Sequence, residues 1–206
     1  MSQTIKKKGR PLSFDRDEAL QKAMLLFWQH GYEATSLNDI TTALGVKPSS
    51  VYSAFGDKKR LFLDAVGLYL SGPVTYETII AQAVSAQDAA QELLRVAAIG
   101  FTGKDTPPGC LLASSVISCS TAANDVKVEL AAIRCKIEAR LRTKILQSID
   151  DEQLPSDADV EGLAATTMSV IQGMSTLARD GATREKLLKV AAKTMLIWPV
   201  NPSALV

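Results

Sequence analysis

Two groups of side chains between residues 47 and 60 have the chemistry of an anion site. The first combines a lysine with short hydroxyl side chains, and the second is a run of three cations directly after a glycine. In order they are Lys47, Ser49, Ser50 and Ser53, then, after Gly56, Lys58, Lys59 and Arg60. Cations at a helix start oppose the macrodipole by about 0.3–1 kcal/mol each when exposed, but the backbone N–H groups there bind phosphate. The pattern predicts a phosphate site at Lys58, with at least one of Lys59 and Arg60 simply facing solvent.

The elements that hold these groups are short helices separated by glycines. Ser36, with an acidic residue three positions later, predicts a helix start, and Gly45 ends that helix. Pro48 suits the first position of the next helix, which the following glycine stops. A helix over residues 15–30 precedes this pair, and another over about 58–71 follows it. This is the layout of a helix-turn-helix, whose second helix enters the major groove of DNA.

Apolar residues of these helices can form a small shared core. They are Phe27, Ile40, Leu44, Val46, Val51, Phe55 and Phe62. Burying them leaves Lys47 and the three serines facing outward, where a lysine can reach a guanine edge or a phosphate and short hydroxyls allow close approach. An alternative stays open, because serines at a helix start are also common caps.

Positive charge is concentrated at the front of the chain. Residues 1–60 hold ten Lys and Arg against six Asp and Glu, whereas the remainder holds thirteen against sixteen. This asymmetry predicts that only the front meets a polyanion. Residues 1–13 are interpreted as a flexible basic arm, with Arg10 as a candidate for the minor groove. The alternative for this arm is a disordered solubilising tail.

Beyond residue 73 every strong pattern is helical, and the predicted fold class is all-α. "TPPG" at residues 106–109 predicts a loop, and "DDEQLPSDAD" at residues 150–159 predicts a linker. The expected helices cover about 76–84, 88–100, 110–120, 124–149, 159–179 and 183–198. The division that follows is an arm over 1–13, a helix-turn-helix domain over 14–57, a connecting helix over 58–72, and a C-terminal effector-binding and dimerisation domain over 73–206.

The last two expected helices are nearly uncharged over residues 164–177 and 191–198. A helix that is apolar all round must be covered all round. One face can meet the chain's own core, and the other predicts a second copy of the protein, most simply in a two-fold homodimer. The alternative is a central helix of a monomeric bundle.

The first 65 residues closely resemble the DNA-binding domain of TetR/AcrR-type transcriptional regulators. The resemblance is carried by "LFWQHGYEATSL" at 26–37, "LGV" at 44–46 and "SSVYSAFGDKKRLF" at 49–62, while "PPGCLLASS" and "QGMSTLARDGATREKLL" resemble one subgroup of these regulators. It implies that the protein is a homodimeric, cytoplasmic regulator. Members of this family are mostly repressors, which a small molecule releases from double-stranded operator DNA. The resemblance also implies phosphate contacts from Thr35, Tyr52 and Lys58 and base contacts from residues 47–50 and Ser53; Tyr52 could alternatively pack in the core. The whole DNA-binding set is Arg10, Thr35, Ser36, Lys47, Pro48, Ser49, Ser50, Tyr52, Ser53 and Lys58.

An effector cavity is expected inside the C-terminal helices, lined by apolar residues with a few polar groups. The candidates are Phe101, Ser118, Cys119, Met168, Ile171, Gln172 and Met174. Each of them is equally compatible with a plain core position, and no residue pattern identifies the effector.

Other function classes find little support. The single histidine, His30, stands at a helix end, and there is no GxSxG, HExxH or Gly-rich phosphate loop, so neither an enzyme nor a cofactor is expected. The three cysteines have no metal-ligand spacing, no apolar run has the length of a membrane span, and the N-terminus lacks the apolar core of a signal peptide.

Two alternatives for the function remain. Cys110, directly after the "TPPG" loop, could hold a thiolate at a helix start and sense oxidants or electrophiles, although a small core residue is the simpler interpretation. The redox activity of Cys119 and Cys135 is likewise left open. The other alternative is a helical adaptor module that does not bind DNA.

Overall fold

The computed structural model describes residues 14–72, 74–116 and 120–199. All regular secondary structure in these ranges is helical, as predicted. The predicted basic arm with Arg10, and the pocket candidates Ser118 and Cys119, lie outside the described residues.

Four helices form the N-terminal head, and the predicted start and stop signals operate at their ends. The helices are α1 (Arg16–His30), α2 (Leu37–Leu44), α3 (Pro48–Phe55) and α4 (Lys58–Leu70). Asp15 accepts hydrogen bonds from two backbone N–H groups of the first turn of α1. Ser36 and Asp39 form a complete capping box on α2. Gly45 ends α2 in the left-handed conformation, with φ of 65°, which glycine adopts without strain.

The predicted core of the head is largely confirmed. Five of its seven residues are buried, namely Phe27, Ile40, Val51, Phe55 and Phe62, while Leu44 and Val46 are half-buried against it. The rings of Phe27 and Phe62 meet edge to face with their centroids 5.0 Å apart. This ring pair joins α1 to α4, the helices that precede and follow the helix-turn-helix.

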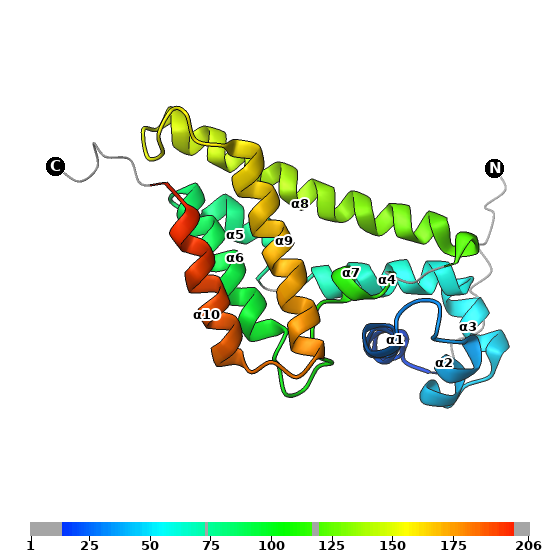
Figure 1. Ribbon diagram of the computed structural model, residues 1–206. Helices are drawn as coiled ribbons and strands as arrows, with labels where there is room; N and C mark the ends of the chain where they lie inside the picture. Colours follow the sequence, from blue (N-terminus) through cyan, green and yellow to red (C-terminus); the bar gives the residue numbers. More distant parts are fainter. Residues whose placement is uncertain (1–13, 73, 117–119, 200–206) are drawn as a thin grey trace, which may run out of the picture.

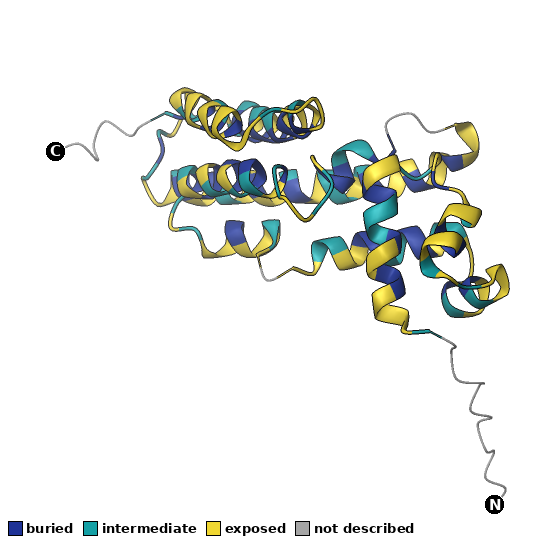
Figure 2. Cartoon of the chain, turned by 90° about the horizontal axis from the view of Figure 1, so that it is seen from below, coloured by how far each residue is buried: buried dark blue, intermediate teal, exposed yellow. Residues whose placement is uncertain are grey.

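The remaining helices form the body, which lies beside the head in Figure 1. They are α5 (Tyr76–Gln82), α6 (Ala86–Gly100), α7 (Leu111–Ser114), α8 (Asn124–Asp150), α9 (Val160–Arg179) and α10 (Arg184–Thr194), with short 3-10 turns at Thr121–Ala123 and Met195–Ile197. Helix α6 packs against α5, α8, α9 and α10, so it occupies the middle of the body. Figure 2 shows that the buried residues gather on the helix faces that meet one another.

Two predicted helices differ from those observed. In the described part of residues 110–120, the expected helix is reduced to the four residues of α7. The chain turns toward the head after it, where the Ser115 carbonyl accepts a hydrogen bond of 2.8 Å from the Tyr32 backbone N–H. The last helix ends at Thr194 and continues as a 3-10 turn. Small shifts occur elsewhere; α6 begins at Ala86 because Ser85, rather than a later residue, caps it.

Gly109, at the end of the predicted "TPPG" loop, occupies a position that only glycine fits. Its φ is +83°, and a Cβ there would lie 2.8 Å from the carbonyl oxygen of Ser175 and 2.9 Å from Cγ of Arg179. Both the backbone conformation and the close approach of α9 therefore exclude a side chain.

We expect Gly109→Ala to lower the free energy of unfolding by about 2–4 kcal/mol, since it combines a strained φ with overpacking. Urea denaturation followed by circular dichroism measures this change. Gly181→Ala is the matched control, because Gly181 has φ of +89° but open space around its Cβ position, and it should lose only about 1 kcal/mol. Equal losses in the two variants would contradict the role given to the contact with α9.

Candidate nucleic-acid interface

The outer face of α3 carries most of the predicted base-contacting residues together. Lys47, Pro48, Ser49, Tyr52 and Ser53 are exposed, and Ser50 is half-buried. The helix starts after Lys47 without a side-chain hydrogen bond to its cap, so the interpretation of these serines as plain caps is not supported. Hydroxyl groups and a lysine therefore lie on the surface of a packed helix, at the place where a helix-turn-helix presents its reading helix.

Tyr52 lies on the same face. Its side chain is 54% exposed, so the alternative that its ring packs in the core does not apply. The backbone around it is fixed, because the Tyr52 carbonyl accepts a hydrogen bond of 2.9 Å from the Gly56 N–H that ends α3. A phenol held in this way can donate to a phosphate oxygen.

Thr35 and Ser36 are placed differently from the α3 residues. Thr35 is 1% exposed, and its hydroxyl donates a hydrogen bond of 2.7 Å to the Gly31 carbonyl, which ties the turn to the end of α1. Ser36 is exposed, but its hydroxyl donates to the Asp39 carboxylate at 2.6 Å. The side-chain and backbone hydrogen bonds from Ser36 lower the pKa of Asp39. The structure therefore does not bring the Thr35 side chain onto the α3 surface.

The three cations at the start of α4 each have a different partner. Lys58 donates a hydrogen bond of 3.2 Å to the Glu33 carbonyl, and its ammonium group lies 4.6 Å from the centroid of the Tyr32 ring. It is thereby held between the start of α4 and the turn that precedes α2. The phosphate contact that the sequence predicts at Lys58 stays a prediction.

The other two cations are each paired with a carboxylate. Lys59 pairs with Asp125 at the start of α8 at 2.7 Å, and Arg60 contacts Asp64 one turn along α4. The hydrogen bond from Lys59 lowers the pKa of Asp125, and the same bond raises the pKa of Lys59. Lys59 is thus a link between head and body, while Arg60, with 73% of its side chain exposed, fits the predicted surface role.

Arg16 stabilises the head and was missed by sequence reasoning. Its guanidinium donates to the Asp64 carboxylate at 2.8 Å and lies 4.7 Å from the centroid of the Phe55 ring. It therefore connects α1 to both α3 and α4. No sequence signal could have identified it, because its partners, which include the Ala54 carbonyl, are 38 to 48 residues away and share no period with it.

Arg179, in the last turn of α9, joins the body to the head and was also missed. Its guanidinium donates to the backbone carbonyls of Trp28 at 3.1 Å and Gln29 at 2.8 Å in the last turn of α1. It also donates to the Ser114 hydroxyl at 3.1 Å. A cation is favoured beside the carbonyls of a helix C-terminus, so α1, α7 and α9 meet at this side chain.

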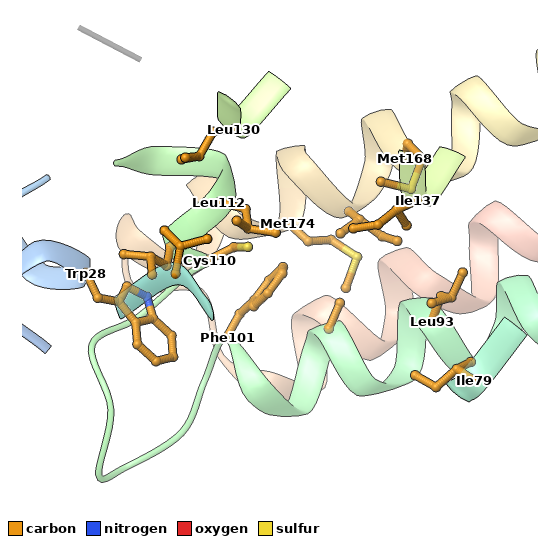
Figure 3. Packing of buried hydrophobic residues seen from close by; sticks show 14 of the residues in the cluster. Trp28, Ile79, Leu93, Phe101, Cys110, Leu112, Leu130, Ile137, Met168 and Met174 are labelled. Carbon is orange, nitrogen blue, oxygen red and sulfur yellow. The ribbon is translucent and has the colours of Figure 1, made fainter. Parts of the chain in front are cut away.

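The residues predicted to line an effector cavity lie in three different parts of the structure. Phe101 lines a cavity of about 190 Å³ between head and body. Met168, Ile171 and Met174 are buried in the core, where Figure 3 shows the two labelled methionines among the packed side chains. Gln172 is exposed and borders a surface depression with Lys127 and Arg134. Of the described pocket candidates, Phe101 alone lines the cavity beside the head.

Cys110 is buried next to that cavity. It is 4% exposed, and its Sγ accepts a hydrogen bond of 3.4 Å from the Tyr69 hydroxyl. The helix that follows it has only four residues, so little macrodipole is available to stabilise a thiolate. These facts favour the simpler interpretation of a core residue, whereas Cys135 is exposed on α8.

Two other site classes find no support within the described ranges. No group of three His, Cys, Asp or Glu side chains there is placed to hold a metal ion. None of the helices in those ranges is long and apolar enough to cross a membrane.

Both the head and the body match known protein families. Residues 19–65 match the family described as bacterial regulatory proteins of the tetR family, and residues 89–192 match the tetracyclin repressor-like C-terminal domain. The HTH-type transcriptional repressor ComR of Escherichia coli strain K12 is 38% identical over 201 residues, which are 96% of each chain. The repressor BdcR of the same strain is 28% identical over 185 residues, 89% of each chain.

A solved structure is similar over almost the whole chain. It is a cysteine mutant of the TetR family transcriptional regulator CifR in complex with 26-base-pair operator DNA, with 36% identity, a TM-score of 0.87, and coverage of 93% of this chain and all of that one. These relatives are regulators, which agrees with the prediction that the chain is not an enzyme. On the match of both domains and the full-length relatives, the chain belongs to the TetR family of transcriptional regulators.

Proposed function

We propose that the protein is a homodimeric repressor whose two heads bind a pseudo-palindromic operator and are released by a small molecule. The observation that carries the proposal is the exposed face of α3, with Lys47, Ser49, Tyr52 and Ser53, on a head whose core is closely packed. The similarity to CifR on operator DNA supports it. In the proposal Lys58 and Tyr52 contact phosphates, and Lys47 and the serines contact base edges.

The proposed dimer uses α9 and α10. A groove of about 550 Å³ runs between these helices, lined by Thr166, Val170, Val190 and Ile197 and bordered by three lysines. Next to it, Leu196 and Ile197 are 74% and 51% exposed. Apolar side chains in such a row are unusual on a monomer surface, and a two-fold partner would cover them.

The proposed division of labour follows the predicted domains. Residues 14–57 read DNA, 58–72 connect, and 73–206 bind the effector and the second protomer, with residues 1–13 as an arm along the DNA. The hydrogen bonds of Arg179 and the Lys59–Asp125 pair support a coupled movement of the two parts. An effector would then favour a conformation whose head spacing no longer matches the half-sites.

We expect the full-length protein to select a fragment of its own genome and to bind it with steep salt dependence, because counterions are released from each neutralised phosphate. Titration of the selected fragment at several salt concentrations measures the slope. A helical adaptor module, the alternative from another class, would show neither selection nor slope.

The phosphate contacts are tested by matched variants. Lys58→Ala should weaken binding to all sequences and reduce the salt slope by about 1 per head. Tyr52→Phe, which removes one hydroxyl, should weaken binding about fivefold. Arg60→Ala is the control, because it removes an exposed cation from the same turn of α4, and it should change binding less than about twofold. Unchanged affinity in Lys58→Ala and Tyr52→Phe together would show that the phosphate contacts are assigned to the wrong residues.

A further inference from the structure

The cavity of about 190 Å³ beside Phe101 has a wall made of both head and body. Trp28 comes from α1, Tyr69 from α4, Tyr76 from α5 and Phe101 from the end of α6. The Trp28 and Tyr69 rings meet edge to face with centroids 4.9 Å apart. Figure 3 shows Trp28, Cys110 and Phe101 close together at the head end of the core.

The polar groups at this cavity are uncharged. Among the described residues, none that lines it is Asp, Glu, Lys, Arg or His. Its polar side chains are those of Tyr69, Thr75 and Tyr76. The Tyr69 hydroxyl donates to the sulfur of Cys110, which does not itself line the cavity, and we call Tyr69, Tyr76 and Cys110 the tyrosine–cysteine cluster. Burial, with Cys110 as a further cause, raises the pKa of both tyrosines well above the ordinary value. Both hydroxyls are therefore neutral hydrogen-bonding groups at physiological pH.

The size of the cavity limits its occupant. A protein cavity of about 150 Å³ with apolar walls binds benzene, so about 190 Å³ holds one ring with a small substituent. An ionised molecule would lose its hydration and find no counter-charge among these walls. Val74, which also lines the cavity, is 58% exposed and marks a route from solvent.

We propose that this cavity is the effector site and that it takes an uncharged, mostly apolar molecule of one ring, whose single hydroxyl or carbonyl group pairs with the tyrosine–cysteine cluster. The regulatory part rests on the proposed function. Trp28 is both a wall of the cavity and a part of the head, where its indole N–H donates to the Gly109 carbonyl at 3.1 Å and its own carbonyl accepts from Arg179. An occupant that displaces Trp28 therefore strains the hydrogen bonds that fix α1 to the body.

A second cavity, of about 220 Å³, lies on another side of Tyr76 and has a different chemistry. It is lined by Glu77, Ile133 and Lys136, so it includes two charged side chains. The two cavities share Leu70, Thr75 and Tyr76. Val96 lines only the first cavity, and Ile133 lines only the second. These two residues provide a matched pair of variants.

Binding is measured without DNA, so the result does not depend on whether the protein is a repressor. In Trp198→Phe protein, Trp28 is the one remaining tryptophan and its fluorescence reports on the cavity. Phenol should produce a saturable fluorescence change, with a dissociation constant at least tenfold lower than that of benzoate or benzylammonium at pH 7. Val96→Phe should abolish this change, and Ile133→Phe should leave the dissociation constant for phenol within twofold of its original value. Thermal unfolding confirms that both variants fold.

The polar contact is tested separately. Tyr76→Phe should weaken the binding of phenol about fivefold, as expected for one lost hydrogen bond. It should leave the affinity for toluene within twofold. Three results would each overturn the proposal. The first is that benzoate binds as tightly as phenol, and the second is that a folded Val96→Phe protein binds phenol undiminished. The third is that the folded Trp198→Phe protein shows no saturable change up to the solubility limit of phenol. If phenol binds as expected but the selected operator fragment is still bound with unchanged affinity, the ligand class stands and its regulatory role is wrong.

Discussion

Val170→Arg should convert the protein from a dimer to a monomer and lower its affinity for a two-half-site operator at least about 100-fold. Val170 lies in the groove between α9 and α10, which Lys186, Lys189 and Lys193 already border. Around a two-fold axis each added arginine would face these lysines and its own copy, and like charges brought together across an interface cost several kcal/mol. The loss of operator affinity follows because two linked heads bind about 10²–10⁴ times more tightly than one.

Light scattering coupled to size-exclusion chromatography gives the mass, and titration of the operator gives the affinity. Val128→Arg is the control: Val128 is 58% exposed near the start of α8 and does not line the groove. It should remain a dimer with unchanged affinity. A Val170→Arg protein with the mass of a dimer and full affinity would place the interface elsewhere and remove α9 and α10 from the proposal.

The helices of the head could be predicted because their signals are local. Each cap involves side chains within three residues of the backbone groups that they bind, as in the pair of Ser36 and Asp39. The apolar spacing then selects the buried faces, which include Ile40, Val51 and Phe55. The outward position of Lys47, Ser49 and Ser53 follows from these two facts, whereas that of Tyr52 was left open between surface and core. The predicted reading face thus needed no knowledge of distant parts of the chain.

The contacts that join head to body could not be predicted in this way. Arg179 binds carbonyls 150 and 151 residues away, and Lys59 binds a carboxylate 66 residues away. Backbone carbonyls leave no trace in the sequence, because every residue has one. The same holds for the shortened α7, whose end is set by a bond to the Tyr32 N–H.

The cavity shows a third limit. The residues that the sequence offers for an effector cavity all lie between 101 and 174, whereas the cavity that we propose as the effector site is also lined by Trp28 from the head and by Tyr69 and Tyr76. Apolar periodicity indicates which residues are buried, but not which buried residues border an unfilled space. Met168 and Met174 satisfy the same periodicity as Phe101 and lie in the filled core.

Phe62→Ala should lower the free energy of unfolding by about 3–5 kcal/mol, the range for a large aromatic side chain removed from a core. Phe62 is 0% exposed, contacts the Phe27 ring edge to face, and lies 4.9 Å from the centroid of the Tyr32 ring. The Tyr32 ring in turn lies under the Lys58 ammonium group, so this one cavity would loosen both the base of the helix-turn-helix and the proposed phosphate contact. Urea denaturation gives the stability. Phe62→Leu, which keeps an apolar side chain in the core but removes the ring, should lose less than about 1.5 kcal/mol. Losses below about 1.5 kcal/mol in both variants would mean that Phe62 contributes little to holding α4 against α1.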